Sequence, residues 1–167
     1  MKQLKFKAGL LLFFFVIVIV SCINPIYPRE MFMQHSATIV VALFLLYSAI
    51  KNTLSNKSFA LIVLFMIFHS IGARYIYSYT PYDQWILSIT GFSIDTYFGF
   101  ERNHYDRFIH FLFGFLILIP LQEIFQRNMS INHKTSFLLA LMSILSLSML
   151  YEVFEWLLSV FLSPDAA

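Results

Sequence analysis

The sequence predicts an all-α fold: a polytopic transmembrane bundle of about five spanning helices, with a short interfacial segment between the third and the fourth. Only 12% of the residues are charged and 59% are hydrophobic, whereas a soluble domain carries roughly 25% charged residues. Five apolar segments also approach the ~20 residues that a helix needs to cross a bilayer. We therefore expect residues 1–167 to form a single transmembrane domain.

Short polar connections separate the expected helices, whose approximate bounds are residues 8–23, 34–50, 58–76, 106–126 and 136–162. The third connection, residues 78–103, is the long one, and tyrosines lie around its start. Such aromatic rings favour the membrane–water interface. Around Trp85 we expect a short helix that lies on the membrane surface.

The first apolar segment has two interpretations. Lysines precede it, and Ile19-Val20-Ser21-Cys22 resembles the processing site of bacterial lipoproteins, which would make residues 1–21 a cleaved signal. The alternative is a retained helix with an incidental cysteine, which we favour because four more spanning segments follow. Since Cys22 is the only cysteine, the chain cannot form an intrachain disulfide.

Basic residues are biased towards one side of the expected bundle. If the N-terminus is cytoplasmic, that side holds Lys2, Lys5, Lys7, Lys51, Lys57, Arg127 and Lys134. Because cytoplasmic connections are enriched in Lys and Arg, we expect this orientation. The net charge is only +2 and the basic residues are scattered between apolar segments. We therefore expect membrane lipids as partners and no nucleic acid.

Polar residues gather towards the other end of the expected bundle. Glu152 lies well beyond Ser136, about 24 Å along its helix at 1.5 Å per residue, so it should reach the depth at which the fourth helix begins. Titratable groups in the outer half of a bilayer are costly, and they often mark a functional site. The candidate residues are His69, Arg74, Arg102, His104, Asp106, Arg107, His110, Glu152 and Glu155.

These residues could hold a metal ion or transfer protons. Asp106 and His110 are four residues apart and share a helix face, and Glu152 and Glu155 share another. Zinc, iron or manganese would accept imidazoles and carboxylates of this kind. A histidine and a glutamate could equally act as base and acid. The candidate metal ligands are His104, Asp106, His110, Glu152 and Glu155.

A structural interpretation competes with both. Arg74, Arg102 and Arg107 could neutralise the two glutamates and lock the helices together without chemistry. Asn103 resembles a helix N-cap that places Asp106 at the third helical position. Glu123 and Arg127, four apart, are expected to form a local ion pair rather than a second site.

Three stretches resemble the YjdF-like family of bacterial inner-membrane proteins: residues 69–81, then Arg102-Asn-His-Tyr-Asp-Arg107 with His110-Phe111, and Tyr151-Glu152 with Glu155-Trp156. The resemblance implies a polytopic protein of the bacterial cytoplasmic (inner) membrane, without indicating an activity. Members of this family usually continue with an Asp-rich loop and a further helix, so this sequence is read as a fragment or a shortened member.

The segment Asp106-Arg107-Phe-Ile-His110-Phe111, followed later by Tyr151-Glu152, also resembles VanZ-like proteins, which implies a role in the cell envelope. The leading hypothesis is a membrane protein that binds a lipid or envelope-precursor headgroup, with arginines as anion contacts. The alternative is a metal-dependent membrane hydrolase or transferase that acts at the outer leaflet. The sequence does not decide whether the protein is an enzyme.

Overall fold

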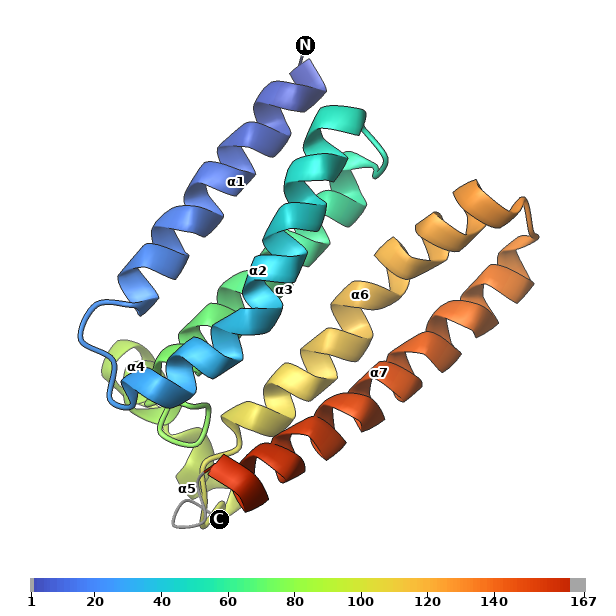
Figure 1. Cartoon of the computed structure of the whole chain (residues 1–167). Coiled ribbons are helices and arrows are strands. Elements are labelled where there is room, and N and C mark those ends of the chain that lie inside the picture. The colour runs from blue at the N-terminus through green and yellow to red at the C-terminus, as the bar shows by residue number, and fades with distance from the viewer. Residues whose placement is uncertain (1, 163–167) are drawn as a thin grey trace.

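The computed structural model describes residues 2–162, apart from the side chains of residues 155, 158, 159, 161 and 162. In this part of the chain the regular structure is helical, without strands, which confirms the predicted all-α fold (Figure 1). The helices are α1 (Lys2–Ser21), α2 (Pro28–Lys51), α3 (Asn56–Arg74), α4 (Tyr82–Thr90), α5 (Ile94–Phe98), α6 (Tyr105–Met129) and α7 (His133–Leu162).

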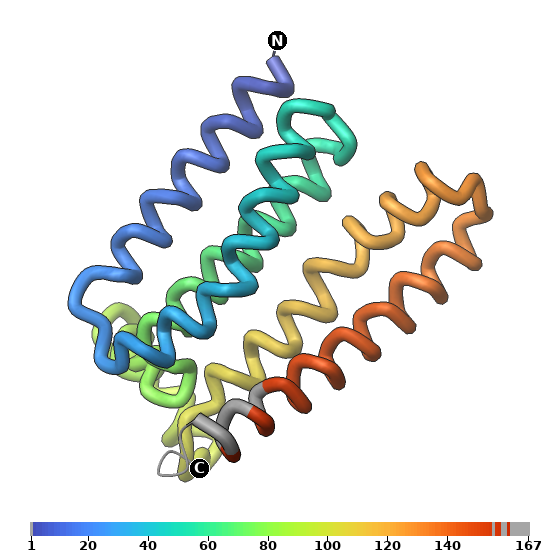
Figure 2. Tube along the Cα trace, in the orientation of Figure 1, coloured from blue at the N-terminus to red at the C-terminus, as the bar shows by residue number. Residues whose placement is uncertain are grey.

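Five of the described helices are long and apolar enough to cross a membrane, as predicted: α1, α2, α3, α6 and α7. Successive spanning helices run in opposite directions, so the start of α1 lies at the same end of the bundle as the α2–α3 and α6–α7 connections (Figure 2). α2 begins at Pro28 rather than near residue 34. A proline suits the first turn of a helix because its φ is preset and no amide donor is needed there.

α3 is the central helix of the bundle. It packs against α1, α2 and α6, whereas α7 packs against α6. Phe59 and Val63 of α3 join Phe14 of α1 and Leu45 of α2 in one buried apolar core. Because lipid tails are as apolar as these side chains, close packing rather than escape from water holds such helices together.

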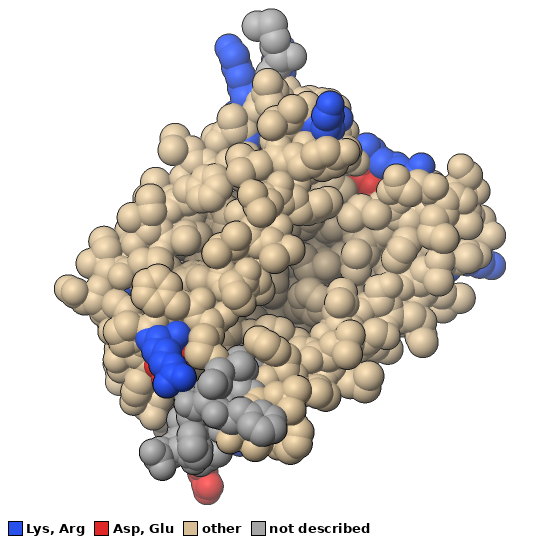
Figure 3. Space-filling view, viewed as in Figure 1, with Lys and Arg blue, Asp and Glu red and all other residues tan. Residues whose placement is uncertain are grey.

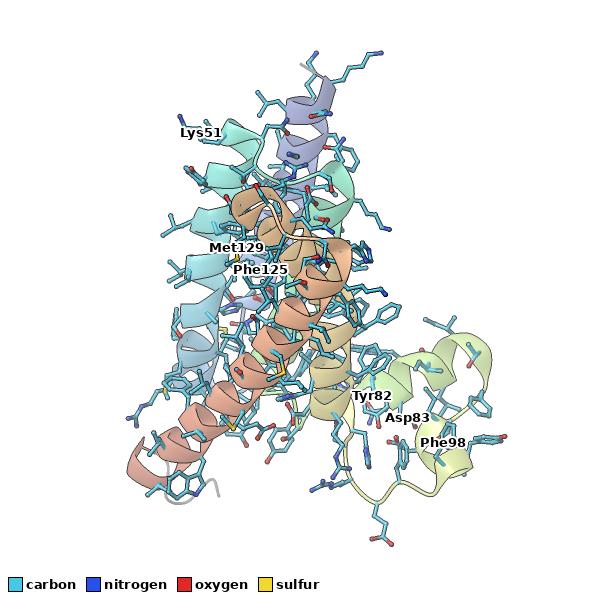
Figure 4. All side chains as sticks on the ribbon, turned by 90° about the vertical axis from the view of Figure 1, so that its right-hand side faces the viewer. Lys51, Tyr82, Asp83, Phe98, Phe125 and Met129 are labelled. Carbon is cyan, nitrogen blue, oxygen red and sulfur yellow. The ribbon has the colours of Figure 1, made fainter. Side chains whose placement is uncertain are left out.

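The long connection between α3 and α6 folds into α4 and α5, which project to one side of the bundle (Figure 4). α4 contains Trp85, so the predicted short helix is confirmed. The Tyr82 hydroxyl donates to Asp95, and the amide of Asp95 donates to Oδ1 of Asp83 at 3.0 Å. Burial and the bond to Asp95 raise the pKa of Tyr82 to about 12, so this hydroxyl keeps its proton at neutral pH and ties α5 to α4.

The opposite end of the bundle carries a polar network around Glu123. The predicted ion pair with Arg127 forms, with Nη2 2.6 Å from Oε1 of Glu123. The carboxylate also accepts the backbone amide and the hydroxyl of Ser55, at 2.7 Å each, and the hydroxyl of Ser58. This carboxylate therefore ties α6 to the first turn of α3.

Lys7 anchors α1 at the same end. Its side chain is fully buried, and Nζ donates to Oδ1 of Asn52 and to the carbonyl of Leu54, each at 2.6 Å. The ammonium also lies 5.5 Å from the centre of the Phe59 ring. A lysine near a helix end usually extends its charge to the interface. Lys7 instead binds α1 to the α2–α3 connection.

Candidate functional site

A groove of about 260 Å³ lies between α2, α3, α6 and α7. α7 packs against α6, which in turn packs against α3, so α7 lies beyond α6 on one side of the bundle (Figure 1). The space-filling view shows a hollow in the middle of this face, between α2 and the α6–α7 hairpin (Figure 3). The groove is lined by Ala37, Val41, Phe65, Met66, His69, Tyr77, Asp106, Ile109, His110, Phe113, Leu147, Ser148 and Tyr151.

The lining changes from polar to apolar along the groove. The polar end lies towards the start of α6, the end of α7 and the turn after α3. Along α6 the lining passes from Asp106 to Phe113, and along α7 it passes from Tyr151 to Leu147 in the same spatial direction. On α3, His69 is followed by Phe65 one turn deeper. α3, α6 and α7 thus each place a polar residue towards this end, whereas α2 contributes only Ala37 and Val41.

His110 occupies the polar end. Its Nε2 lies 3.5 Å from Oδ1 of Asp106 and 3.4 Å from Oε1 of Glu152. Asp106 faces His110 because it lies one helical turn earlier. Glu152 comes from α7, about 28 Å along that helix from His133. The structure thus brings together three of the residues that the sequence predicted to meet.

Tyr151 bridges the groove at this end. Its hydroxyl donates to Oε1 of Gln34 on α2, and its ring lies 6.4 Å from the ring of His110. α2 and α7 are thereby joined beside the polar groups.

A chain of buried hydrogen bonds leads from the groove into the α1–α3 core. Oη of Tyr77 lies 2.7 Å from Nδ1 of His69, and Nε2 of His69 lies 3.1 Å from Oγ1 of Thr38. Oγ1 of Thr38 lies 3.0 Å from Nδ1 of His35, whose Nε2 lies 3.0 Å from Oγ of Ser21. All five side chains are buried. The chain joins α1, α2, α3 and the turn that follows α3.

The donor and the acceptor of each hydrogen bond in this chain can be assigned by starting from Ser21. The Ser21 hydroxyl donates its one proton to the carbonyl of Val18 at 2.7 Å, so it accepts from Nε2 of His35. A neutral imidazole, which burial favours, has one donor and one acceptor nitrogen. Because Nε2 of His35 is the donor, Nδ1 of His35 accepts the hydroxyl proton of Thr38. Thr38 then accepts from Nε2 of His69, so Nδ1 of His69 accepts from Tyr77. The Tyr77 hydroxyl therefore donates its proton to His69, within the buried chain.

A tight turn holds Tyr77 over the core. Ile76 and Tyr77 have φ angles of 44° and 57°, in the left-handed region that side chains disfavour. The amide of Tyr77 donates to the carbonyl of Gly72 at 2.8 Å. A Cβ at Gly72 would come within 2.5 Å of the Tyr77 ring. A glycine is therefore required where the tyrosine approaches the helix.

His69 was expected from the sequence, whereas His35, Thr38 and Tyr77 were not. His35 and Thr38 are three residues apart on one face of an apolar helix, and a titratable residue in such a helix is a signal that could have identified them. Tyr77 gives no comparable signal. It lies among the tyrosines assigned to the interface, and only the turn after α3 directs its hydroxyl back to His69.

Arg74 contacts the end of α1 rather than a carboxylate. Its Nη1 donates to the carbonyls of Val20 at 2.9 Å and Ser21 at 3.3 Å, and to that of Ile23. The last carbonyls of a helix lack partners within the helix and carry partial negative charge. Arg74 therefore ties α3 to α1, and the neutralisation of Glu152 and Glu155 by arginines stays a hypothesis.

The other two predicted arginines also lie outside the groove lining. Nη1 of Arg107 is 2.9 Å from Nδ1 of His104, whose ring stacks on Phe100 with the centres 4.0 Å apart. His104 borders a second, largely aromatic cavity of about 510 Å³ between α3, α4 and α6. Arg102 is exposed in the connection before α6. The structure thus separates His104 from His110.

The N-cap of α6 lies one residue after the predicted one. This N-cap is His104, so Asp106 is the second helical residue and the predicted N-cap role of Asn103 is wrong. Oδ1 of Asn103 accepts the amide of Tyr105 at 2.9 Å, and its Nδ2 donates to the carbonyl of Thr80 at 2.7 Å. Asn103 still satisfies one amide of the first turn, while Asp106 faces His110.

Within the described part of the chain, no three His, Cys, Asp or Glu side chains lie close enough together to hold a metal ion. The side chain of Glu155 falls outside that part. The zinc, iron or manganese site considered from the sequence therefore stays a prediction. The arrangement that the structure does describe is one imidazole between two carboxylates.

Two matches relate the chain to known proteins. A family model described as "Predicted membrane protein (DUF2238)" matches residues 6–167. The Inner membrane protein YjdF of Escherichia coli (strain K12) is 29% identical over 126 residues, which cover 74% of this chain and 56% of YjdF. The chain therefore spans a little over half the length of that relative. No solved structure matches the chain.

Proposed function

The chain belongs to the DUF2238 family of membrane proteins, which confirms the YjdF-like assignment, and on this premise we propose that it is an inner-membrane protein whose groove binds an amphiphile. The apolar chain of the ligand lies between α2 and α7, in the deeper part of the groove. The polar group lies beside Asp106, His110 and Glu152.

The observation that carries this proposal is the polar-to-apolar gradient of the lining. A purely structural contact between helices needs no such order, whereas an amphiphile needs one end of each kind. The groove volume of about 260 Å³ lies just below the ~300 Å³ at which small-molecule sites begin. It therefore has room for part of one apolar chain rather than for a whole two-chain lipid.

The orientation of the bundle is part of the proposal. The lysines at the starts of α1 and α3 and at the end of α2 favour a cytoplasmic N-terminus. The polar end of the groove then lies towards the outer leaflet, together with α4 and α5. A lipid of that leaflet can reach the groove sideways, between α2 and α7, with its headgroup at the depth of Asp106.

Blocking the groove tests the proposal. Ser148→Trp on α7 and Ala37→Trp on α2 place a large side chain in the groove from opposite walls. Both variants should lose lipid that the native chain retains through purification in mild detergent, as counted by native mass spectrometry. Two variants are used because overpacking can also destabilise a helix contact.

Met149→Trp is the matched control, since Met149 follows Ser148 at nearly the same depth and is 62% exposed. It should retain lipid as the native chain does. Equal lipid retention in Met149→Trp and in both groove variants, with unchanged melting temperatures, would refute a binding groove.

Fewer observations support the alternative function, that of a metal-dependent hydrolase or transferase. It rests on His110, whose Nε2 faces two carboxylates, an arrangement suited to moving a proton at the polar end. Within the described residues these three groups do not form a set that could hold a metal ion. We therefore place binding before catalysis.

A further inference from the structure

We infer that the groove selects a lipid of the surrounding bilayer whose headgroup carries a primary ammonium, in preference to one that offers only phosphate or hydroxyl groups. The inference rests on the proposed binding function and names the headgroup chemistry for the same site. Its basis is that the polar end of the groove offers hydrogen-bond acceptors and negative charge to a ligand, rather than donors and positive charge.

Both tyrosines that line the groove already donate their hydroxyl protons to other residues. Tyr77 donates to Nδ1 of His69 at 2.7 Å, a direction fixed by the buried chain that ends at Val18. Tyr151 donates to Oε1 of Gln34. A phenol has a single O–H donor. Neither tyrosine can therefore donate to a phosphate in the groove without breaking an existing bond.

The charges at the polar end of the groove also favour a cationic headgroup over an anionic one. Asp106 and Glu152 flank His110, so even a protonated imidazole would leave the three groups with a net negative charge. The carboxylates are 45% and 62% exposed, which leaves them accessible to a ligand. An ammonium supplies three N–H donors to such acceptors, whereas a headgroup whose sole charge is a phosphate would be repelled.

The three arginines that could have favoured an anionic headgroup lie outside the groove lining. Arg74 is held by the carbonyls at the end of α1, and Arg107 lies against His104 beside the second cavity. Neither these two residues nor Arg102 lines the groove, and Glu152 borders it through its contact with His110, which does line it. The anion-binding role expected for the three arginines from the sequence is therefore not favoured in this groove, and a cationic headgroup is.

The test compares three lipids with identical palmitoyl and oleoyl chains on the purified full chain, by native mass spectrometry. Phosphatidylethanolamine carries a primary ammonium, phosphatidylcholine carries a cation without N–H donors, and phosphatidylglycerol carries no cation. We expect the affinity to fall in that order, with the first bound about tenfold more tightly than the last, as two partly exposed charge contacts would give. Asp106→Asn with Glu152→Gln should abolish the preference while keeping the side-chain shapes.

Glu101→Gln is the control, because Glu101 is an exposed carboxylate in the connection before α6; it should keep the native preference. Phosphatidylglycerol binding that equals or exceeds phosphatidylethanolamine binding, yet is still blocked by Ser148→Trp, would overturn the headgroup inference alone. A preference that survives in the Asp106→Asn, Glu152→Gln variant would also overturn it. Lipid binding that Ser148→Trp and Ala37→Trp leave unchanged would instead refute the groove, and the inference with it.

Discussion

The hydrogen bond from Tyr77 to His69 links the groove to the buried core and can be removed with little change of shape. Tyr77→Phe leaves Nδ1 of His69 buried without its donor, which should lower the free energy of unfolding by about 1–3 kcal/mol. The melting temperature in detergent measures the loss. Tyr79→Phe, at a tyrosine that is 54% exposed, should change it little. Equal effects of the two substitutions would show that the buried chain contributes no stability.

His110 distinguishes binding from metal chemistry. We expect protein purified without added metal to contain less than one zinc, iron or manganese ion per chain, by elemental analysis, because within the described residues no group of His, Cys, Asp and Glu side chains is placed to hold a metal ion. Stoichiometric metal that disappears in His110→Ala would contradict this expectation and assign the chain to the metal-dependent class. Removing a bound metal would then also lower the stability of the native chain, since metal binding is linked to folding.

Among the elements, α1 is fixed at both ends. Lys7 is buried against Asn52 and Leu54 near its start, and Arg74 holds the carbonyls at its end. We therefore expect intact mass spectrometry of the purified chain to show residues 1–21 retained and Cys22 unmodified. A chain that begins at a diacylglyceryl-modified Cys22 would contradict this, and would show that the lipoprotein interpretation is correct.

The spanning helices could be predicted from the sequence because their signal is local: a run of apolar residues of bilayer length, bounded by Pro, Asn or Lys. The convergence of Asp106, His110 and Glu152 could also be predicted, since alternating helix directions set their depth. The contacts of Arg74 could not be predicted, because a guanidinium can bind either a carboxylate or the carbonyls at a helix end. Only the tertiary structure determines which of these acceptors lies within its reach. The position of Tyr77 likewise depends on two left-handed residues that no sequence pattern marks.

At the scale of the whole molecule, the orientation in the membrane decides which leaflet supplies the ligand. A reporter fused after Lys134 should be active on the cytoplasmic side, and one fused after Asp165 on the opposite side, because the basic connections favour the cytoplasm. The reversed pattern would place the polar end of the groove at the cytoplasmic leaflet. The groove itself would remain, but its lipid would come from the other side.

The groove is a property of the whole bundle rather than of any helix. α3 and α6 pack closely, and α7 follows α6 rather than α2, so a space remains that four helices line and none fills. Local sequence patterns do not reveal it, since its apolar residues resemble those that face lipid. Leu147 lines the groove and Leu145 does not, although both side chains are about half exposed, so only the arrangement of the helices distinguishes them.

The most direct measurement of the central claim is photo-crosslinking with a phospholipid that carries a diazirine in its acyl chain, followed by peptide mapping. Binding in the groove predicts labels concentrated at Val41, Phe113 and Leu147, and their loss in Ser148→Trp but not in Met149→Trp. Labels spread evenly over exposed positions such as Leu138 and Leu145, and unchanged by Ser148→Trp, would show that the lipid only surrounds the bundle and would contradict the account.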